Sequence, residues 1–139
     1  GVGVAFRLPV IASFEFIPEI TEHFTRFTEQ GSVINAVNDT YGWLATVWLL
    51  VIAAPVIEEF AFRGAILGGL QRYLPFYAAN IIQAVLFAMV HTLESSLSVF
   101  YIFALGLVFG VLRRKYDGLL VPIICHATFN GILTFLLLG

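Results

Sequence analysis

The sequence predicts an all-α protein, a polytopic bundle of transmembrane helices that encloses a polar site. The first observation is composition: 60 per cent of the 139 residues are apolar and 12 per cent are charged, whereas soluble domains average about 45–50 per cent and about 25 per cent. The second is a set of four long apolar segments, and the third is a small group of ionisable residues inside them. A soluble domain of this size could not bury so much apolar surface, so a lipid bilayer is the expected surrounding.

The four apolar segments are residues 41–57, 74–91, 95–112 and 118–139. Each is close to the roughly 20 residues that cross a bilayer. Backbone N–H and C=O groups find no partner in hydrocarbon, so these segments are expected to be helices. The period-two alternation of a membrane β-barrel is missing. Together they form the predicted membrane core, residues 41–139, with four transmembrane helices.

Residues 1–40 are predicted to form a separate N-terminal region. Residues 1–17 are apolar apart from Arg7 and Glu15, which predicts a partial membrane helix. In residues 18–40, apolar side chains recur at helical spacing between charged ones, a pattern typical of an amphipathic helix at a membrane surface. An ordinary solvated loop is an equally good interpretation of this second stretch.

The charges in the loops predict an orientation. Arg72 lies between the first and second of the four apolar segments, and residues 113–115 (RRK) lie between the third and fourth. Two crossings separate these sites, so they share one side, which the positive-inside rule makes cytoplasmic. The net charge of −2 offers no basic footprint, so no nucleic-acid partner is expected.

The helix that begins with the first apolar segment carries three ionisable residues at membrane depth. Such residues are costly in lipid, usually face the bundle interior and mark function. Glu59 and Arg63 are four apart, so they share a helix face and can form a structural ion pair. Glu58 lies about 100° away from Glu59 around the helix. Glu58 therefore needs another partner. A carboxylate without a cation in an apolar site has the profile of a general base.

Three further polar residues lie in the later segments. His91 ends the segment 74–91, and His126 and Asn130 lie four apart on one face of the last segment. Taken singly, each could be a satisfied core residue or a hydrogen bond between helices. Counted from the cytoplasmic ends at 1.5 Å per residue, Glu58 and these three fall in one band, about 12–24 Å deep. The sequence therefore predicts that they meet in a shared site.

Three short motifs now resemble those of the CAAX protease and bacteriocin-processing family. Residues 58–63 (EEFAFR) match its EExxxR motif, residues 87–91 (FAMVH) match FxxxH, and residues 126–130 (HATFN) match HxxxN. All three occur in the family's order, each near a membrane helix. The resemblance covers about residues 45–135 and leaves the N-terminal third without a usable motif.

The resemblance implies an intramembrane endopeptidase of the CAAX prenyl protease type. By analogy, Glu58 and His91 would activate a water for attack on a peptide carbonyl, and His126 and Asn130 would stabilise the oxyanion. The Glu59–Arg63 ion pair would support Glu58. No serine or cysteine is placed beside these groups as a nucleophile, which favours direct attack by water.

No cofactor is favoured, but zinc is the competing expectation. Glu58, His91 and His126 are three residues of the types that hold a catalytic zinc with an open fourth position. The HExxH signature of common zinc proteases is missing. Both mechanisms stay open at this stage, and a chelation experiment separates them.

Two other classes of protein use similar residues. The first is a non-catalytic membrane scaffold or bacteriocin-immunity protein, which the complete motifs disfavour. The second is a proton-coupled transporter, which would normally show internal repeats or broken helices. The sequence shows neither pattern, which disfavours this class. The expected partners are the lipid bilayer and a peptide or protein substrate, and the relatives that process prenylated proteins make a lipidated substrate one option. The predicted protein is integral and multi-pass, with its active site reached from the cytoplasmic side.

Overall fold

The computed structural model describes residues 34–91 and 96–138. Every described element is a helix, which confirms the predicted all-α class. The predicted N-terminal membrane helix lies outside the described residues, as does most of the 18–40 segment. After helical residues 34–41, the elements in chain order are α3 (Trp43–Val47), the π-helical η1 (Trp48–Ala53), α4 (Ala54–Glu59), the π-helical η2 (Phe60–Ile66), α5 (Leu67–Leu70), α6 (Phe76–Val90), α7 (Ser96–Lys115) and α8 (Leu120–Leu138).

The elements from α3 to α5 form one continuous helix, Trp43–Leu70. Its first π-helical stretch, η1, ends just before Pro55, which lies in the first turn of α4. A proline has no N–H, and in an α-helix its ring clashes with the carbonyl four residues earlier. The i→i+5 pattern of a π-helix relieves this conflict, and the Ala54 N–H accordingly bonds to the Leu49 carbonyl. Local sequence therefore explains why the helix widens here, one turn before its acidic pair.

Two short turns set the direction of the later helices. The first helix ends at Leu70, and the chain reaches Leu74 and Pro75 after a short turn. A residue before proline is disfavoured in the α conformation, and α6 begins directly after Pro75. At the end of α7, Asp117 takes the left-handed conformation with φ 47°, which aspartate tolerates. The Gly118 N–H then returns to the Arg113 carbonyl at 3.2 Å, closing the helix end.

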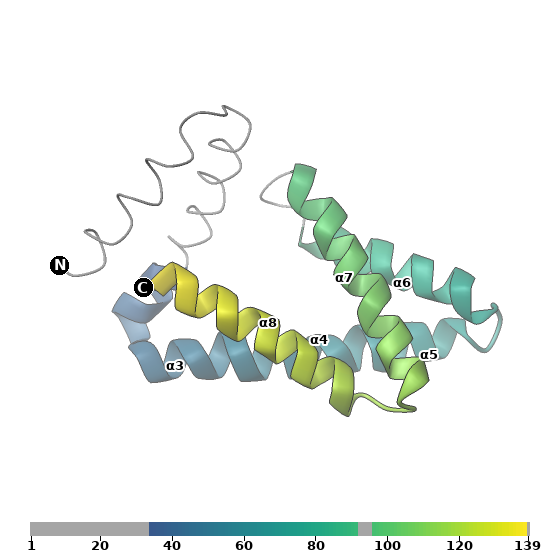
Figure 1. The fold of residues 1–139 in the computed structure, drawn as a ribbon, viewed down its shortest axis with the longest axis horizontal. Helices are drawn as coiled ribbons and strands as arrows, with labels where there is room; N and C mark the ends of the chain where they lie inside the picture. The colour runs from purple at the N-terminus through teal and green to yellow at the C-terminus, as the bar shows by residue number, and fades with distance from the viewer. Residues whose placement is uncertain (1–33, 92–95, 139) are drawn as a thin grey trace.

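The helices pack so that three of them reach the acidic segment of the first. Figure 1 shows α8 lying along the long helix, with its C-terminal end near α3. Helix α8 contacts η1 and α4, while α6 and α7 pack against each other and both touch η2. The residues that follow one another along α4 and η2 therefore face side chains from α6, α7 and α8.

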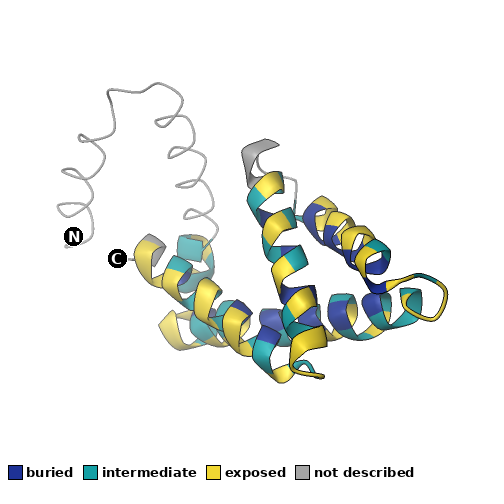
Figure 2. Cartoon of the chain, turned by 45° about the vertical axis from the view of Figure 1, so that its right-hand side comes forward, coloured by how far each residue is buried: buried dark blue, intermediate teal, exposed yellow. Residues whose placement is uncertain are grey.

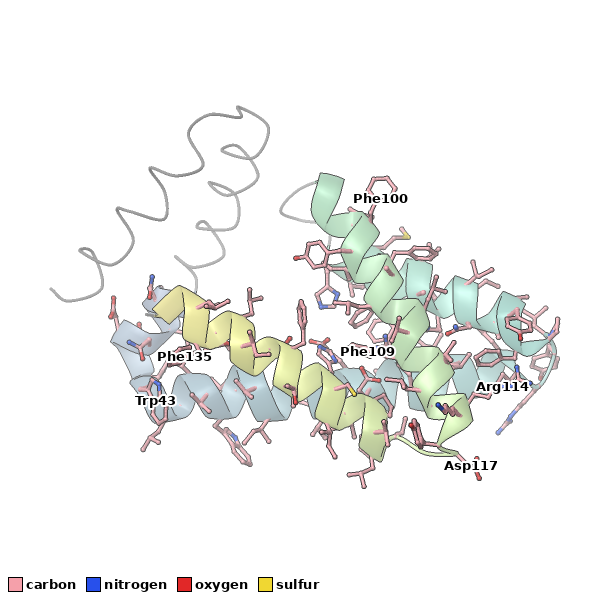
Figure 3. All side chains as sticks on the ribbon, viewed as in Figure 1. Trp43, Phe100, Phe109, Arg114, Asp117 and Phe135 are labelled. Atoms are coloured by element: carbon pink, nitrogen blue, oxygen red, sulfur yellow. The ribbon has the colours of Figure 1, made fainter. Side chains whose placement is uncertain are left out.

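The packing is inverted relative to a soluble protein. The largest fully buried side chains include Arg63, Gln83 and Glu59. Phe100 and Phe135 are 71 % and 78 % exposed and project from the outer surfaces of their helices (Figure 3). Figure 2 shows the buried residues gathered where the helices cross and the exposed ones on the outward faces. Apolar outer faces around polar side chains suit a bundle whose solvent is lipid.

Length and composition qualify one helix in the described part of the chain as a membrane span. This is Trp43–Leu70, with 28 residues, while Phe76–Val90 and Leu120–Leu136 are apolar but shorter. The prediction of four crossings therefore stays a prediction. The Arg113 guanidinium donates to the Gln71 side-chain oxygen at 3.3 Å, so the basic loop residues gather at one end of the bundle. The predicted division into residues 1–40 and 41–139 stays a prediction as well.

Candidate active site

Glu59 and Arg63 form a completely buried ion pair at the centre of the bundle. Arg63 Nη1 lies 3.0 Å from Glu59 Oε1, and both side chains are 0 % exposed. The two residues are one helical turn apart, the spacing that lets their side chains meet on one helix face. Burying both charges is tolerable in the bundle interior because each neutralises the other.

Glu58 points to a different face and lies between two histidines. Its Oε2 is 3.5 Å from His91 Nε2 and 3.6 Å from His126 Nε2. This oxygen is buried and makes no hydrogen bond within residues 34–91 and 96–138. The Glu58 and His91 side chains are 25 % and 33 % exposed, whereas His126 is 6 % exposed. The structure thus brings together three of the four predicted catalytic residues, and two of them can be reached by a small molecule.

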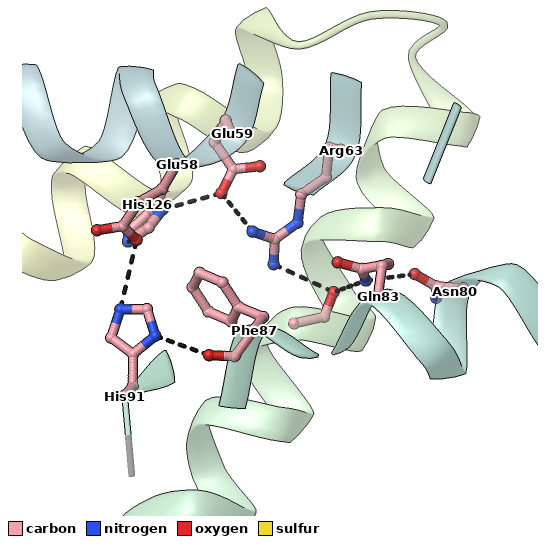
Figure 4. Close-up of polar contacts among 9 residues, drawn as sticks. Glu58, Glu59, Arg63, Asn80, Gln83, Phe87, His91 and His126 are labelled. Carbon is pink, nitrogen blue, oxygen red and sulfur yellow. Dashed lines mark hydrogen bonds and ion pairs between the residues drawn. The ribbon is translucent and has the colours of Figure 1, made fainter. Parts of the chain in front are cut away.

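Hydrogen bonds at the other ring nitrogens fix how the two imidazoles face Glu58. His91 Nδ1 lies 2.7 Å from the Phe87 carbonyl oxygen, which can only accept, so Nδ1 carries the proton. His126 Nδ1 lies 2.9 Å from Glu59 Oε1, the oxygen that also accepts from Arg63, so this Nδ1 donates as well (Figure 4). In its neutral form, each ring therefore presents an unprotonated Nε2 to Glu58.

A count of charges shows what these groups can hold. With neutral imidazoles, the two carboxylates and the Arg63 guanidinium sum to a net charge of −1. An uncompensated charge is costly in an apolar interior. One additional proton makes the group neutral, and three atoms face one another to share it: Glu58 Oε2 and the Nε2 atoms of His91 and His126. Such a site can accept a proton from a water molecule and return it.

Asn130 lies one turn after His126 but contacts a different part of the first helix. Its Nδ2 donates to the Leu50 carbonyl oxygen at 2.9 Å. In the π-helical pattern of η1, that carbonyl would pair with the N–H of residue 55, which is Pro55 and has none. The Ala54 N–H is already bonded to the Leu49 carbonyl. Asn130 therefore supplies a donor that the backbone lacks, and it keeps a second amide hydrogen.

Aromatic rings enclose the polar group on the side of α6 and α7. The Phe87 ring lies 4.3 Å from the Arg63 guanidinium carbon and 4.6 Å and 5.9 Å from the rings of His91 and His126. The Phe109 ring stacks on His126 at 5.1 Å. These rings exclude water, and their faces attract the positive charge of the Arg63 guanidinium. Sequence analysis gave no role to Phe109, because nothing in its uncharged segment distinguishes it from the other phenylalanines.

The site opens onto a cavity of about 350 Å³. Glu58, His91, His126 and Asn130 all line it, and most of the remaining wall is apolar. Ligand sites commonly combine an apolar wall with a few convergent polar groups. The other lining residues come from residue 34, η1, α6, α7 and α8: Ile34, Leu50, Phe87, Val90, Tyr101, Ile102, Leu105, Phe109, Phe129, Leu133 and Thr134.

The fit of a metal ion can be judged from the donor set. One carboxylate oxygen and two imidazole nitrogens face one another, and both imidazoles donate their other N–H, as metal-bound histidines do. However, no group of three or more His, Cys, Asp or Glu side chains in the described ranges is arranged to hold a metal ion. The donor types fit zinc, and their present arrangement does not form its site.

Comparison with known proteins places the chain in a family. Residues 40–132 match the family model described as "Type II CAAX prenyl endopeptidase Rce1-like". The chain is 33 % identical over 79 residues to "Putative membrane peptidase YdiL" of Bacillus subtilis (strain 168), a match that covers 57 % of this chain and 32 % of that protein. It is 30 % identical over 91 residues to "Membrane-embedded CAAX protease MroQ" of Staphylococcus aureus (strain USA300), covering 61 % of this chain and 36 % of that protein.

The matches therefore span about a third of the length of these two relatives. No solved structure matches the chain significantly. The family match includes all three motifs that form the polar site, and it covers well over half of the chain. This chain belongs to the Rce1-like family of type II CAAX prenyl endopeptidases.

Proposed function

We propose that the protein is an intramembrane endopeptidase that hydrolyses a peptide bond with a water molecule activated by Glu58 and His91. One observation carries the proposal: Glu58 Oε2 lies between the Nε2 atoms of His91 and His126, 3.5 Å and 3.6 Å away, on the wall of one cavity. The family and the names of the two bacterial relatives support a peptidase.

In the first step, Glu58 takes a proton from the water while the water oxygen forms a bond to the peptide carbonyl carbon. His91 Nε2 orients the water by accepting its second hydrogen, because the Phe87 carbonyl holds the proton of this ring on Nδ1. The carbonyl electron pair moves to oxygen and forms the oxyanion. Glu58 then gives the proton to the leaving nitrogen, the C–N bond breaks, and a carboxylic acid and an amine result.

His126 and Asn130 are proposed to stabilise the oxyanion. His126 can donate from Nε2 only when both ring nitrogens carry a proton, and its Nδ1–H is already bonded to Glu59 Oε1. Asn130 has one amide hydrogen left after its bond to Leu50. Each donor aimed at a developing oxyanion contributes on the order of 10²–10³ in rate. Glu59 and Arg63 thus support the reaction through His126, in addition to the predicted support of Glu58.

The proposed substrate is a peptide or protein segment with apolar side chains near the scissile bond. Apolar residues from three helices form most of the cavity wall, so an apolar segment gains by entering it. A lipid attached to the substrate would be compatible with the same wall. We further propose that the protein crosses the bilayer several times and that the basic end of the bundle faces the cytoplasm, from where the site is reached.

The alternative is that zinc, held by Glu58, His91 and His126, supplies Lewis acid chemistry to the same hydrolysis. The orientation of both imidazoles by acceptors at Nδ1 is the observation that favours this alternative. The glutamate mechanism remains the proposal because Glu58 Oε2 and His91 Nε2 face one another at 3.5 Å on the cavity wall, where one water can meet both.

The test is cleavage of a panel of fluorogenic peptides with apolar residues by the purified protein in proteoliposomes. We expect Glu58→Gln to lower kcat by about 10²–10⁴-fold, because the amide has the size of the acid but cannot accept the proton. Asp117→Asn is the matched control: Asp117 is exposed in the turn after α7, and asparagine tolerates its left-handed backbone. This control should keep the parent rate.

Activity of Glu58→Gln at the parent rate would overturn the assignment of the base, and a parent protein that cleaves no peptide would overturn the peptidase proposal. A second arm measures bound metal and activity after strong chelation. Full activity at a metal content far below one ion per protein supports the glutamate mechanism. Loss of activity that only zinc restores replaces it with the zinc mechanism.

A further inference from the structure

Two buried amide side chains of α6 lie outside all three motifs. Gln83 is 0 % exposed and Asn80 is 4 % exposed. Gln83 Nε2 donates to Asn80 Oδ1 at 2.8 Å and to the Gly106 carbonyl oxygen of α7 at 2.9 Å. Asn80 Nδ2 donates to the neighbouring Leu107 carbonyl at 3.1 Å. A buried polar pair is costly in an apolar bundle unless it is fully bonded, which raises the question of what this pair does.

The same carbonyl connects Gln83 to the candidate active site. Arg63 Nη2 donates to the Gly106 oxygen at 3.3 Å, while Nη1 of the same guanidinium bonds to Glu59. Glu59 in turn accepts from His126 Nδ1. These contacts form a continuous path from Gln83 to His126, drawn as dashed lines in Figure 4, in which the unlabelled carbonyl between Gln83 and Arg63 is that of Gly106. The guanidinium is therefore held from both ends, by the carboxylate at one and by the Gly106 carbonyl at the other.

The orientation of the Gln83 amide turns its oxygen toward Arg63. Both Nε2 hydrogens are used by acceptors, so Oε1 must point away from Asn80 and Gly106, toward the Arg63 guanidinium (Figure 4). Gln83 Oε1 and Arg63 Nε are both buried and have no hydrogen-bond partner among the described residues. One is an acceptor and the other a donor, so the two groups are complementary.

Glycines make this arrangement possible. A Cβ atom at Gly106 would lie 3.0 Å and 3.1 Å from Cβ and Cα of Ala84, and one at Gly110 would overlap the Asn80 amide. Small residues let two membrane helices approach closely. The close approach of α6 and α7 brings the Gly106 carbonyl within reach of both Gln83 and Arg63. Helix packing and the path to the site therefore depend on the same contact.

We propose that Gln83 is a positioning residue for the hydrolysis, acting through Arg63 and Glu59 on His126. The inference rests on the proposed function, because a positioning residue needs a reaction to serve. Gln83 is not among the described residues that line the cavity. It fixes the guanidinium, the guanidinium fixes Glu59 Oε1, and that oxygen sets the direction of the His126 ring. The reaction loses the aim of its oxyanion donor when this path is cut.

The test variant is Gln83→Met, which keeps the length of the side chain and removes its hydrogen bonds. We expect kcat on a cleaved peptide to fall about tenfold or more while KM stays within about twofold of the parent, because substrate binding is untouched. The matched control is Thr46→Val, since Thr46 is equally buried and its hydroxyl donates to the Gly42 carbonyl, one helical turn back at the start of the same helix. This control should keep both kinetic constants.

A second readout does not depend on turnover. In ¹H–¹⁵N spectra that detect imidazole N–H groups, we expect Gln83→Met to move or broaden the Nδ1–H signal of His126 and to leave that of His91 in place. This arm decides the inference even if the parent cleaves no peptide, an outcome that would count against the proposed function alone. Gln83→Glu is the second variant if Gln83→Met fails to fold; its carboxylate competes with Glu59 for Arg63 and should move the same signal.

Three results would overturn the inference. The first is a parent-like kcat together with an unmoved His126 signal in Gln83→Met. The second is an equal fall in kcat in Thr46→Val, which would show that any buried polar residue matters. The third is a rise in KM of more than about twofold with an unchanged kcat, which would place the effect on substrate binding.

Discussion

Replacing Pro55 by alanine gives residue 55 a backbone N–H at the point where the Leu50 carbonyl lacks a main-chain donor. In the parent, Asn130 Nδ2 supplies that donor at 2.9 Å. Asn130→Ala leaves the carbonyl unpaired, which should lower the free energy of unfolding by about 1–2 kcal/mol, since hydrogen bonds between membrane helices are worth about 0.6–1.7 kcal/mol. With alanine at residue 55, the new N–H takes over, and Asn130→Ala should cost less.

The quantity to measure is therefore the coupling between Pro55 and Asn130 in a double-mutant cycle. We expect a coupling free energy of about 1 kcal/mol, one net hydrogen bond. The assay is reversible unfolding of the four proteins in mixed detergent and SDS micelles, followed by circular dichroism. The cycle subtracts the cavity that Pro55→Ala creates, because this term is present in both variants that carry it.

A second fully buried proline provides the control. Pro122 lies in the first turn of α8, where a missing N–H leaves no carbonyl unpaired. Pro122→Ala and Asn130→Ala should add within about 0.5 kcal/mol. If Pro55→Ala and Asn130→Ala are also additive within that limit, Asn130 does not compensate for the proline, and the reasoning is refuted.

Two further predictions concern the buried interfaces. Gly106→Ala should lower the free energy of unfolding by about 1–3 kcal/mol, because its Cβ would press on the Ala84 backbone. Gly69→Ala is the control: a Cβ there has no atom within 4 Å, so this variant should be neutral or more stable by up to about 1 kcal/mol. Equal effects of the two variants in the same unfolding assay would contradict this packing. Arg63→Leu should lower the free energy of unfolding by about 3–5 kcal/mol, because it leaves the Glu59 carboxylate buried without a cation. Adding Glu59→Gln should restore part of that stability. A double variant that is less stable than Arg63→Leu alone would show that the buried charge is not the cause.

Much of the site could be predicted because its residues carry their own signal. An ionisable side chain in an apolar segment stands out, and helical spacing sorted Glu58 from the Glu59–Arg63 pair before any contact was known. Asn80 and Gln83 gave a similar signal: with Phe87 and His91 they follow one another at intervals of three or four residues, which places all four on one face of α6. The sequence analysis did not single them out, because they carry no charge and belong to none of the three motifs.

The remaining features depend on distances between helices. Which carbonyl Asn130 meets follows from the π-helical register beside Pro55, and no motif encodes that register. The shared use of the Gly106 oxygen by Gln83 and Arg63 follows from how closely α6 and α7 approach. Residues 106 and 110 show the small-xxx-small spacing of a close contact, but their partner helix is not written in that spacing.

The sequence by itself determined the all-α class, the apolar segments and the polar residues that had to leave the lipid, because each of these depends on the transfer of single side chains or short segments between water and hydrocarbon. Only the tertiary structure decided that Glu58 lies between two imidazoles, that Glu59 serves Arg63 and His126 with one oxygen, and that Asn130 turns to Leu50. These are choices among partners on different helices, and they are set by helix packing and register.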